Sequence, residues 1–134
     1  MSVEIRTHKD LKIWQRSVAL VTRVYAITEK FPKSEMWGLT NQIRRASVSV
    51  PSNIAEGSGR RSDKELVQFL HIASGSLAEL ETQFIIAKNL GFITNNEYSD
   101  IEQEIQEIIR MVSAMSKSIL NKQPSNGFGT SRSS

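Results

Sequence analysis

Residues 42–61 read QIRRASVSVPSNIAEGSGRR, and this stretch decides both the fold and the candidate site. Its apolar residues recur at helical spacing, yet Pro51 lies inside the pattern. A proline inside a helix costs roughly 3 kcal/mol and frees a backbone carbonyl, so the surrounding fold must compensate. Two arginine pairs bracket the stretch, and their forked guanidinium groups suit phosphates or carboxylates. We therefore expect a helix that kinks at Pro51, resumes to about Glu56, and carries charge beside the kink.

Around this stretch, apolar residues at alternating three- and four-residue spacing predict four helices. The first helix should end at Phe31, because a residue that precedes proline avoids the α region. The second should begin near Ser34 and end in a left-handed cap at Gly57 and Gly59. Capping boxes at residues 62–65 and 94–97 should start the third and fourth helices. Gly91 should end the third helix, and the fourth should run to about Asn121.

The inward residues of these helices predict the core. They are Ile13, Ser17, Leu20, Val24, Ile27 and Phe31, then Leu39, Ile43, Ala46, Val50 and Ile54, then Leu66, Leu70, Ala73, Leu77, Leu80, Phe84 and Ala87, and finally Tyr98, Ile101, Ile105, Ile108, Val112, Met115 and Ile119. Gly75 lies mid-helix, where glycine is unfavourable, and predicts the close approach of another backbone. Similar helix lengths and short connections predict an all-α, up-down-up-down antiparallel four-helix bundle over residues 1–121. The Gly/Ser/Asn-rich tail, residues 122–134, should be disordered.

The first helix carries a second apolar stripe, at Trp14, Val18, Val21 and Tyr25. One bundle does not need all of this surface, so part of it should be buried between subunits. The sequence therefore predicts a homo-oligomer.

The composition limits the class of protein. A chain of 134 residues fits one domain with a real core. Without cysteine there can be no disulfide framework and no thiolate metal site. The polar N-terminus lacks the apolar segment of a secretory signal, and no apolar run approaches the roughly 20 residues that span a bilayer. These features predict a soluble cytoplasmic protein with no membrane partner.

The charge is unevenly distributed along the chain. Residues 6–64 contain twelve Lys and Arg against five Asp and Glu, whereas residues 65–121 contain three against eight. The fourth helix should present an acidic outer face at Asp100, Glu102, Glu104 and Glu107. This asymmetry predicts either a polyanionic partner or two oppositely charged halves that pack as neighbours.

These residues resemble the bacterial four-helix-bundle proteins related to those encoded in intervening sequences of 23S ribosomal RNA genes. The resemblance covers the chain to about Leu120. The residues that carry it are Asp10-Leu11 with Trp14, Gly38-Leu39-Thr40, and the segments at 42–46, 50–57, 75–77 and 79–83.

The resemblance implies a left-handed antiparallel bundle that assembles into a homopentamer with a central channel. It also implies kinship with the accessory variability proteins of diversity-generating retroelements. Those proteins are basic and associate with a reverse transcriptase and nucleic acid. The resemblance supplies no established molecular activity.

The candidate nucleic-acid-binding residues are basic: Arg44, Arg45, Arg60, Arg61, Lys64, Lys12 and Arg16. One interpretation is sequence-independent contact with phosphates of RNA or DNA. The alternative is that Arg44 or Arg45 pairs with Glu56, Glu79 or Glu81, within a chain or between subunits. The turn around Arg60 and Arg61 contains no interleaved aromatic residues, so base stacking there is not expected.

Pro51, Asn53 and Glu56 form a second candidate, a polar site at the helix kink. The alternative is that these side chains satisfy backbone groups that the proline frees. His8 and His71 are the only histidines, and no Glu-x-x-His motif of a di-iron bundle occurs. The sequence therefore predicts no metal, no cofactor and no catalytic residues.

The sequence as a whole predicts a non-enzymatic oligomeric scaffold that associates with nucleic acid or a ribonucleoprotein through a basic patch. The alternative is a protein-interaction module, in which the same arginines build the oligomer or hold an acidic partner.

Overall fold

The fold is described by a computed structural model, which covers residues 6–122. In this range the chain forms four α-helices, α1 (Lys12–Thr28), α2 (Leu39–Ser58), α3 (Asp63–Asn89) and α4 (Asn95–Lys122), and two short 3-10 helices, η1 (His8–Asp10) and η2 (Lys33–Glu35). No strand occurs in the same range. The predicted tail, residues 122–134, lies outside the described residues except for Lys122, which ends α4.

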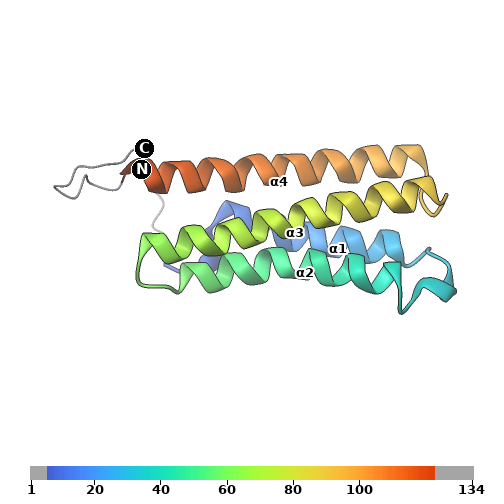
Figure 1. Ribbon diagram of the computed structural model, residues 1–134, viewed down its shortest axis with the longest axis horizontal. Coiled ribbons are helices and arrows are strands. Elements are labelled where there is room, and N and C mark those ends of the chain that lie inside the picture. Colours follow the sequence, from blue (N-terminus) through green and yellow to red (C-terminus); the bar gives the residue numbers. More distant parts are fainter. Residues whose placement is uncertain (1–5, 123–134) are drawn as a thin grey trace.

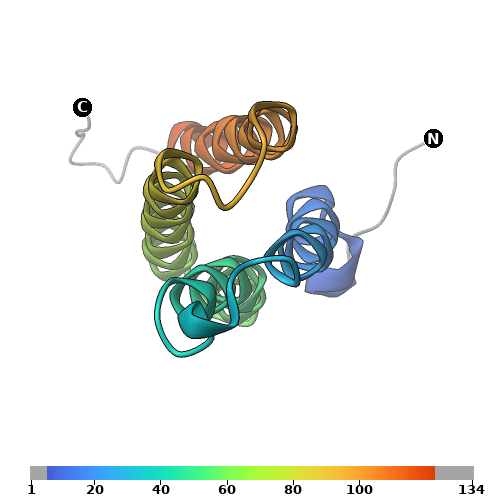
Figure 2. The same cartoon turned by 90° about the vertical axis from the view of Figure 1, so that its right-hand side faces the viewer.

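The four helices run alternately up and down along one axis (Figure 1). Each helix packs against the next one in the chain, and α1 also packs against α4, which closes the bundle (Figure 2). The prediction of an all-α, up-down-up-down four-helix bundle is confirmed.

The core fills the space between the helices with apolar side chains from all four. Leu20, Ile43, Phe84 and Ile105, one from each helix, have no solvent-accessible surface. These positions belong to the stripes that the three- and four-residue spacing indicated, because residues at that spacing share one helix face. Leu39, Leu66, Tyr98, Met115 and Ile119 are partly buried at the margins of the same core.

The capping box predicted at residues 94–97 forms in full, whereas only one of the two hydrogen bonds of the box predicted at residues 62–65 is present. The Ser62 hydroxyl accepts a hydrogen bond from the Glu65 backbone N–H at 3.1 Å. At the start of α4, Thr94 and Glu97 form a reciprocal capping box, with both hydrogen bonds at 3.0 Å. Gly91 follows α3 with a φ of 78°, a left-handed conformation that glycine adopts without strain.

Two predicted helix ends are wrong. Helix α1 ends at Thr28, and Phe31 instead lies in the following turn, where its buried ring packs against Phe92 at 5.5 Å. Helix α2 begins at Leu39, since residues 33–35 form η2 and a turn separates the two. Phe31 is therefore buried by a turn rather than by continued helix.

The end of α2 also differs from the prediction. The helix continues to Ser58, and Gly59 has a φ of −87°, so neither Gly57 nor Gly59 forms a left-handed cap. The same helix runs through Pro51, which is buried. Near the proline, Asn53 Nδ2 donates to the Ser49 carbonyl at 2.8 Å, which adds a side-chain contact to this part of the backbone.

Gly57, rather than Gly75, is the glycine that permits a close approach. A Cβ added at Gly57 would lie 2.8 Å from the Phe69 Cβ and 3.1 Å from the Leu66 Cδ1, both on α3. A Cβ added at Gly75 would have no described neighbour within 4 Å, so the prediction of a close backbone contact there is wrong within the chain. Helices α2 and α3 therefore approach closely near their shared turn.

Replacing Gly57 by alanine should push α3 away from α2, because the nearest atom is a Cβ fixed to the backbone. We expect Gly57→Ala to lower the free energy of unfolding by about 1–3 kcal/mol, a typical cost of overpacking. Gly75→Ala is the matched control and should raise it by about 0.5–1 kcal/mol, because alanine is the better helix former. Urea denaturation of the two variants measures both, and equal effects would contradict the assigned contact.

Candidate nucleic-acid interface

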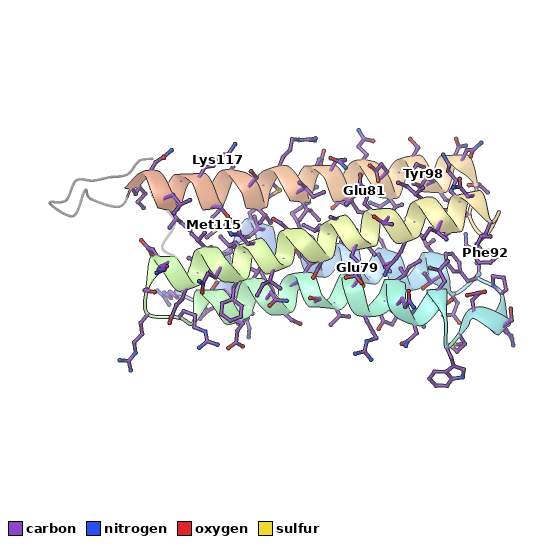
Figure 3. The ribbon with its side chains drawn as sticks, in the orientation of Figure 1. Glu79, Glu81, Phe92, Tyr98, Met115 and Lys117 are labelled. Carbon is purple, nitrogen blue, oxygen red and sulfur yellow. The ribbon has the colours of Figure 1, made fainter. Side chains whose placement is uncertain are left out.

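One end of the bundle brings together four parts of the chain. Here lie η1, the start of α1, the α2–α3 turn with the first turn of α3, and the last turns of α4 (Figure 1). Six exposed cations belong to these segments and form no ion pair within residues 6–122: Lys9, Lys12, Arg61, Lys64, Lys117 and Lys122. We call these six residues the basic end. Figure 3 shows Lys117 on α4 in the half of the bundle that contains this end.

The two arginines of the α2–α3 turn have different surroundings. Arg60 forms an ion pair with Glu56 at 2.6 Å, and its guanidinium lies 4.9 Å from the centre of the Phe69 ring. Arg61 is exposed and has no such partner among the described residues. Lys64 is similarly exposed at the start of α3. Of the predicted candidates, Arg61, Lys64 and Lys12 are thus gathered at one end with charges that remain available.

Arg44 and Arg45 lie far from this end. From Arg45 to Ser58 the helix spans thirteen residues, or about 20 Å along its axis. Arg44 covers the Tyr25 ring at 4.4 Å, donates to the Thr28 hydroxyl at 2.8 Å, and pairs with Glu29 at 3.4 Å. Its side chain is only 19% exposed, so it joins α2 to α1. The acidic partner is Glu29, and not Glu56, Glu79 or Glu81 as the sequence suggested.

Arg45 is exposed and makes no ion pair within the described part of the chain. One residue separates it from Arg44, which is a rotation of about 100° around the helix. That rotation takes Arg45 off the α1–α2 seam, and its distance along the helix keeps it away from the basic end.

Arg16 lies on the seam between α1 and α4. Its guanidinium donates to Glu104 at 3.1 and 3.2 Å and also to Glu107, and Arg23 lies 3.8 Å from Glu104. Hydrogen bonds first to Glu104 and then to Glu107 raise the pKa of Arg16 above its ordinary value. The predicted acidic outer face of α4 is therefore wrong for these two glutamates, which are half-buried beside arginines. It is also wrong for Glu102, which is partly buried towards α3.

The residues around Pro51 do not converge into a polar site. Asn53 donates to the carbonyl and the hydroxyl of Ser49, at 2.8 and 2.9 Å. Glu56 instead reaches along the helix surface to Arg60. The predicted site at Pro51, Asn53 and Glu56 is therefore divided between a backbone contact and a surface ion pair.

The sequence missed an acid pair on the seam between α3 and α4. Gln106 Nε2 donates to Glu81 and, at 3.0 Å, to Glu102, so one amide group holds carboxylates from both helices together. Glu81 lies on α3 towards α4 in Figure 3. The other Glu102 oxygen, Oε1, is buried and accepts no hydrogen bond from the described residues. The sequence did contain one signal for the burial of Glu102. This residue lies four residues after Tyr98 and seven before Ile109, so it shares a helix face with these two partly buried residues.

Burial, followed by the hydrogen bond with Glu81, raises the pKa of Glu102 from 4.5 to about 7. A proton on Glu102 replaces repulsion between the two carboxylates with a hydrogen bond. Tyr98 lies on the same seam, where burial and then the charges of Glu102 and Glu81 raise its pKa. Lys88 lies over the Tyr98 ring at 4.6 Å.

Two further findings concern residues 6–122. No three side chains of His, Asp or Glu lie close enough together there to hold a metal ion. None of the helices in this range combines the length and the apolar character that crossing a lipid bilayer requires.

Comparisons with known proteins support the resemblance seen in the sequence. A family model described as 23S rRNA-intervening sequence protein matches residues 9–114. A solved structure of a protein of unknown function, from the S23 ribosomal protein family of Bacteroides thetaiotaomicron VPI-5482, is similar with a TM-score of 0.71 and 21% identity. The similarity covers 78% of this chain and 98% of that one, and at this identity it shows the fold alone. No curated protein matches the chain.

The acid pair makes stability depend on pH. The pKa of Glu102 is higher in the folded state, so its stabilising proton is fully effective below pH 4.5 and is lost as the pH rises through about 7. Above pH 7, the free energy of unfolding of the Glu102→Gln variant should therefore exceed that of the parent protein by about 1–2 kcal/mol, after allowance for solvent screening.

Urea denaturation at pH 4.5, 6 and 8 measures this difference, which should disappear at pH 4.5. Asp100→Asn removes an exposed carboxylate two residues away on α4 and should leave the pH profile unchanged. A parallel profile for Glu102→Gln and the parent protein would contradict the shared proton.

Proposed function

The chain belongs to the 23S rRNA-intervening sequence protein family, and we propose that it is a non-enzymatic oligomeric scaffold that binds nucleic acid through its basic end. The observation that supports this proposal most strongly is the convergence of six exposed cations from η1, α1, the α2–α3 turn, the start of α3 and α4, none of which forms an ion pair within residues 6–122. Lysine and arginine contact phosphates without reading the bases, so binding should be independent of sequence.

The carboxylates near the basic end do not cancel its charge by pairing with these six residues. Asp10 accepts hydrogen bonds from the backbone N–H groups of Arg6 and Thr7, at 2.9 and 3.2 Å, and the first of these contributes most to lowering its pKa. Glu56 is paired with Arg60. Asp63 and Glu65 lie in the first turn of α3, where negative charge compensates the helix dipole.

Exposed apolar side chains support assembly into an oligomer. Val18 and Tyr25 on α1, with Val48 on α2, are each about 40% exposed, and Ile72 and Ile86 on α3 are exposed to a similar extent. Helices α1 and α3 occupy opposite corners of the bundle (Figure 2). Two different apolar surfaces on different faces favour head-to-tail contacts, which close into a ring when the rotation between subunits permits. The homopentamer that the resemblance implies is a ring of this kind.

A second candidate function, a protein-interaction module, is favoured by Trp37. Its side chain is 88% exposed in the turn before α2, and neighbouring Met36 is 47% exposed. Exposed tryptophan is enriched among residues that dominate protein interfaces. Under this alternative, the basic end would contribute solubility rather than phosphate contacts.

Nucleic-acid binding should depend on salt and on the basic end. Each phosphate contact on a duplex contributes about −0.9 to the slope of log affinity against log salt. If Arg61 and Lys64 each contact a phosphate, Arg61→Gln/Lys64→Gln should flatten that slope by about 1.8 and weaken binding to all sequences alike. Titration of RNA and DNA at four salt concentrations by fluorescence anisotropy measures the slope.

The double variant Lys33→Gln/Arg45→Gln is the matched control. It removes the same charge from exposed residues outside the basic end and should leave the slope close to that of the parent protein. Absence of binding to RNA and DNA at low salt would refute the proposed function and favour the interaction module. Equal slopes for the two double variants would place the phosphate contacts elsewhere.

The assembly should have a mass several times that of the 15.1 kDa chain, and five times if the pentamer is correct. Ile72→Lys introduces a charge on the exposed face of α3 and should reduce the mass without lowering helix content. Leu120→Lys makes the same type of change near the end of α4 and should preserve the mass. Light scattering with circular dichroism measures both properties, and a parent protein that remains monomeric at micromolar concentration would exclude the oligomer.

A further inference from the structure

We propose that a hollow in the basic end binds the base of an unpaired nucleotide, such as the last nucleotide of a strand. This inference rests on the proposed function, because the basic end would hold the phosphates of the same strand. It goes further by assigning a separate site to a base, which phosphate contacts alone do not recognise.

The hollow has a volume of about 260 Å³. Four elements or their flanking residues line it: η1, α2, α3 and α4. The lining residues are Arg6, Thr7, His8, Leu11, Ser58, Leu66 and Met115. Figure 3 shows Met115 on the side of α4 that faces α3. The hollow adjoins the basic end through His8 and Leu11, which directly precede Lys9 and Lys12.

The chemistry of the lining matches a nucleobase, which has apolar faces and polar edges. Leu11, Leu66 and Met115 are partly buried and supply apolar surface. Thr7, His8 and Ser58 add two hydroxyl groups and an imidazole. The Ser58 hydroxyl donates to the Ile54 carbonyl at 2.9 Å, which leaves its oxygen able to accept a hydrogen bond from a base.

One wall of the hollow is aromatic. The His8 ring packs edge-on against the Trp14 ring, with 5.1 Å between the ring centres, and this contact orients the imidazole. The sequence around Arg60 and Arg61 contained no interleaved aromatic residue, so base contacts were not expected there. The fold supplies the ring from η1, about fifty residues earlier in the chain.

Charge favours a nucleotide over an apolar peptide side chain as the occupant. Lys9 and Lys12 directly follow the lining residues His8 and Leu11, and this positive charge attracts a ligand that carries phosphate beside its apolar part. A base within a continuous duplex is stacked on both faces, so the hollow is accessible to bases at strand ends, in overhangs and in single strands.

Proton NMR of the two histidines provides a direct test. Adenosine 5′-monophosphate should shift the imidazole resonances of His8 and leave those of exposed His71 unchanged, whereas inorganic phosphate alone should shift neither. Equal shifts of His8 with phosphate and with the nucleotide would overturn the inference, because the site would then recognise only an anion. A Glu-Leu-Glu peptide that binds the hollow more tightly than the nucleotide would also overturn it, in favour of a protein partner.

Variants of the full-length protein connect the hollow to strand binding. Ser58→Phe should fill the hollow, and His8→Ala should remove its aromatic wall. Each should weaken binding of the nucleotide and of a duplex with a single-stranded overhang by at least fivefold, while blunt-duplex affinity changes by less than twofold. His71→Ala is the matched control and should change none of these affinities. Thermal melting of each variant verifies that the bundle remains folded.

The outcomes separate this inference from the proposed function. Suppose that the blunt duplex binds with the expected salt dependence, but that Ser58→Phe and His8→Ala change neither the affinity for the nucleotide nor the affinity for the overhang duplex. The inference then fails and the proposed function stands. If the nucleotide shifts the His8 resonances and both variants weaken its binding, but neither RNA nor DNA binds, the hollow is a nucleotide site and the proposed function fails.

Discussion

The basic end depends on the close approach of α2 and α3 at Gly57. Because this residue has no side chain, Leu66 and Phe69 of α3 can lie against the backbone of α2. Leu66 then forms part of the hollow, and Phe69 lies under the guanidinium of Arg60. The same contact brings the start of α3, with Lys64, beside the turn that carries Arg61. The absence of a Cβ at Gly57 therefore permits the packing of both the apolar and the basic parts of this end.

The structure divides the cations of the N-terminal half into two groups. Arg16, Arg23 and Lys30 face α4 or its preceding turn and pair with Glu104, Glu107 and Glu97. For these residues, the interpretation of two oppositely charged halves that pack as neighbours is correct. The six cations of the basic end, and Lys33 and Arg45 outside it, form no ion pair within residues 6–122. At the basic end, the nearby Asp10 and Glu56 already have other partners. Net charge alone does not distinguish the paired cations from the others.

Helix periodicity made the architecture predictable from the sequence. It did not make the roles of individual polar residues predictable. Ile43 and Phe84 lie in the core because each belongs to a repeated stripe, and a stripe averages over many residues. Arg44 and Arg45 look equivalent in the sequence, but only Arg44 is rotated towards Tyr25 and Thr28. The roles assigned to Gly57 and Gly75 were wrong, because the distance from a glycine to a neighbouring helix is a property of packing. The hollow joins segments that lie more than a hundred residues apart, so local spacing contains no signal for it.

The proton on the Glu81–Glu102 pair has a consequence for the heat of folding. Between pH 4.5 and about 7, the unfolded chain has largely released the Glu102 proton, while the folded bundle retains it. Folding in this range therefore takes up a proton from the buffer, and the buffer's own heat of ionisation enters the calorimetric enthalpy. Unfolding at a fixed pH near 6 should consequently give different apparent enthalpies in phosphate and in imidazole, even though the free energy is the same.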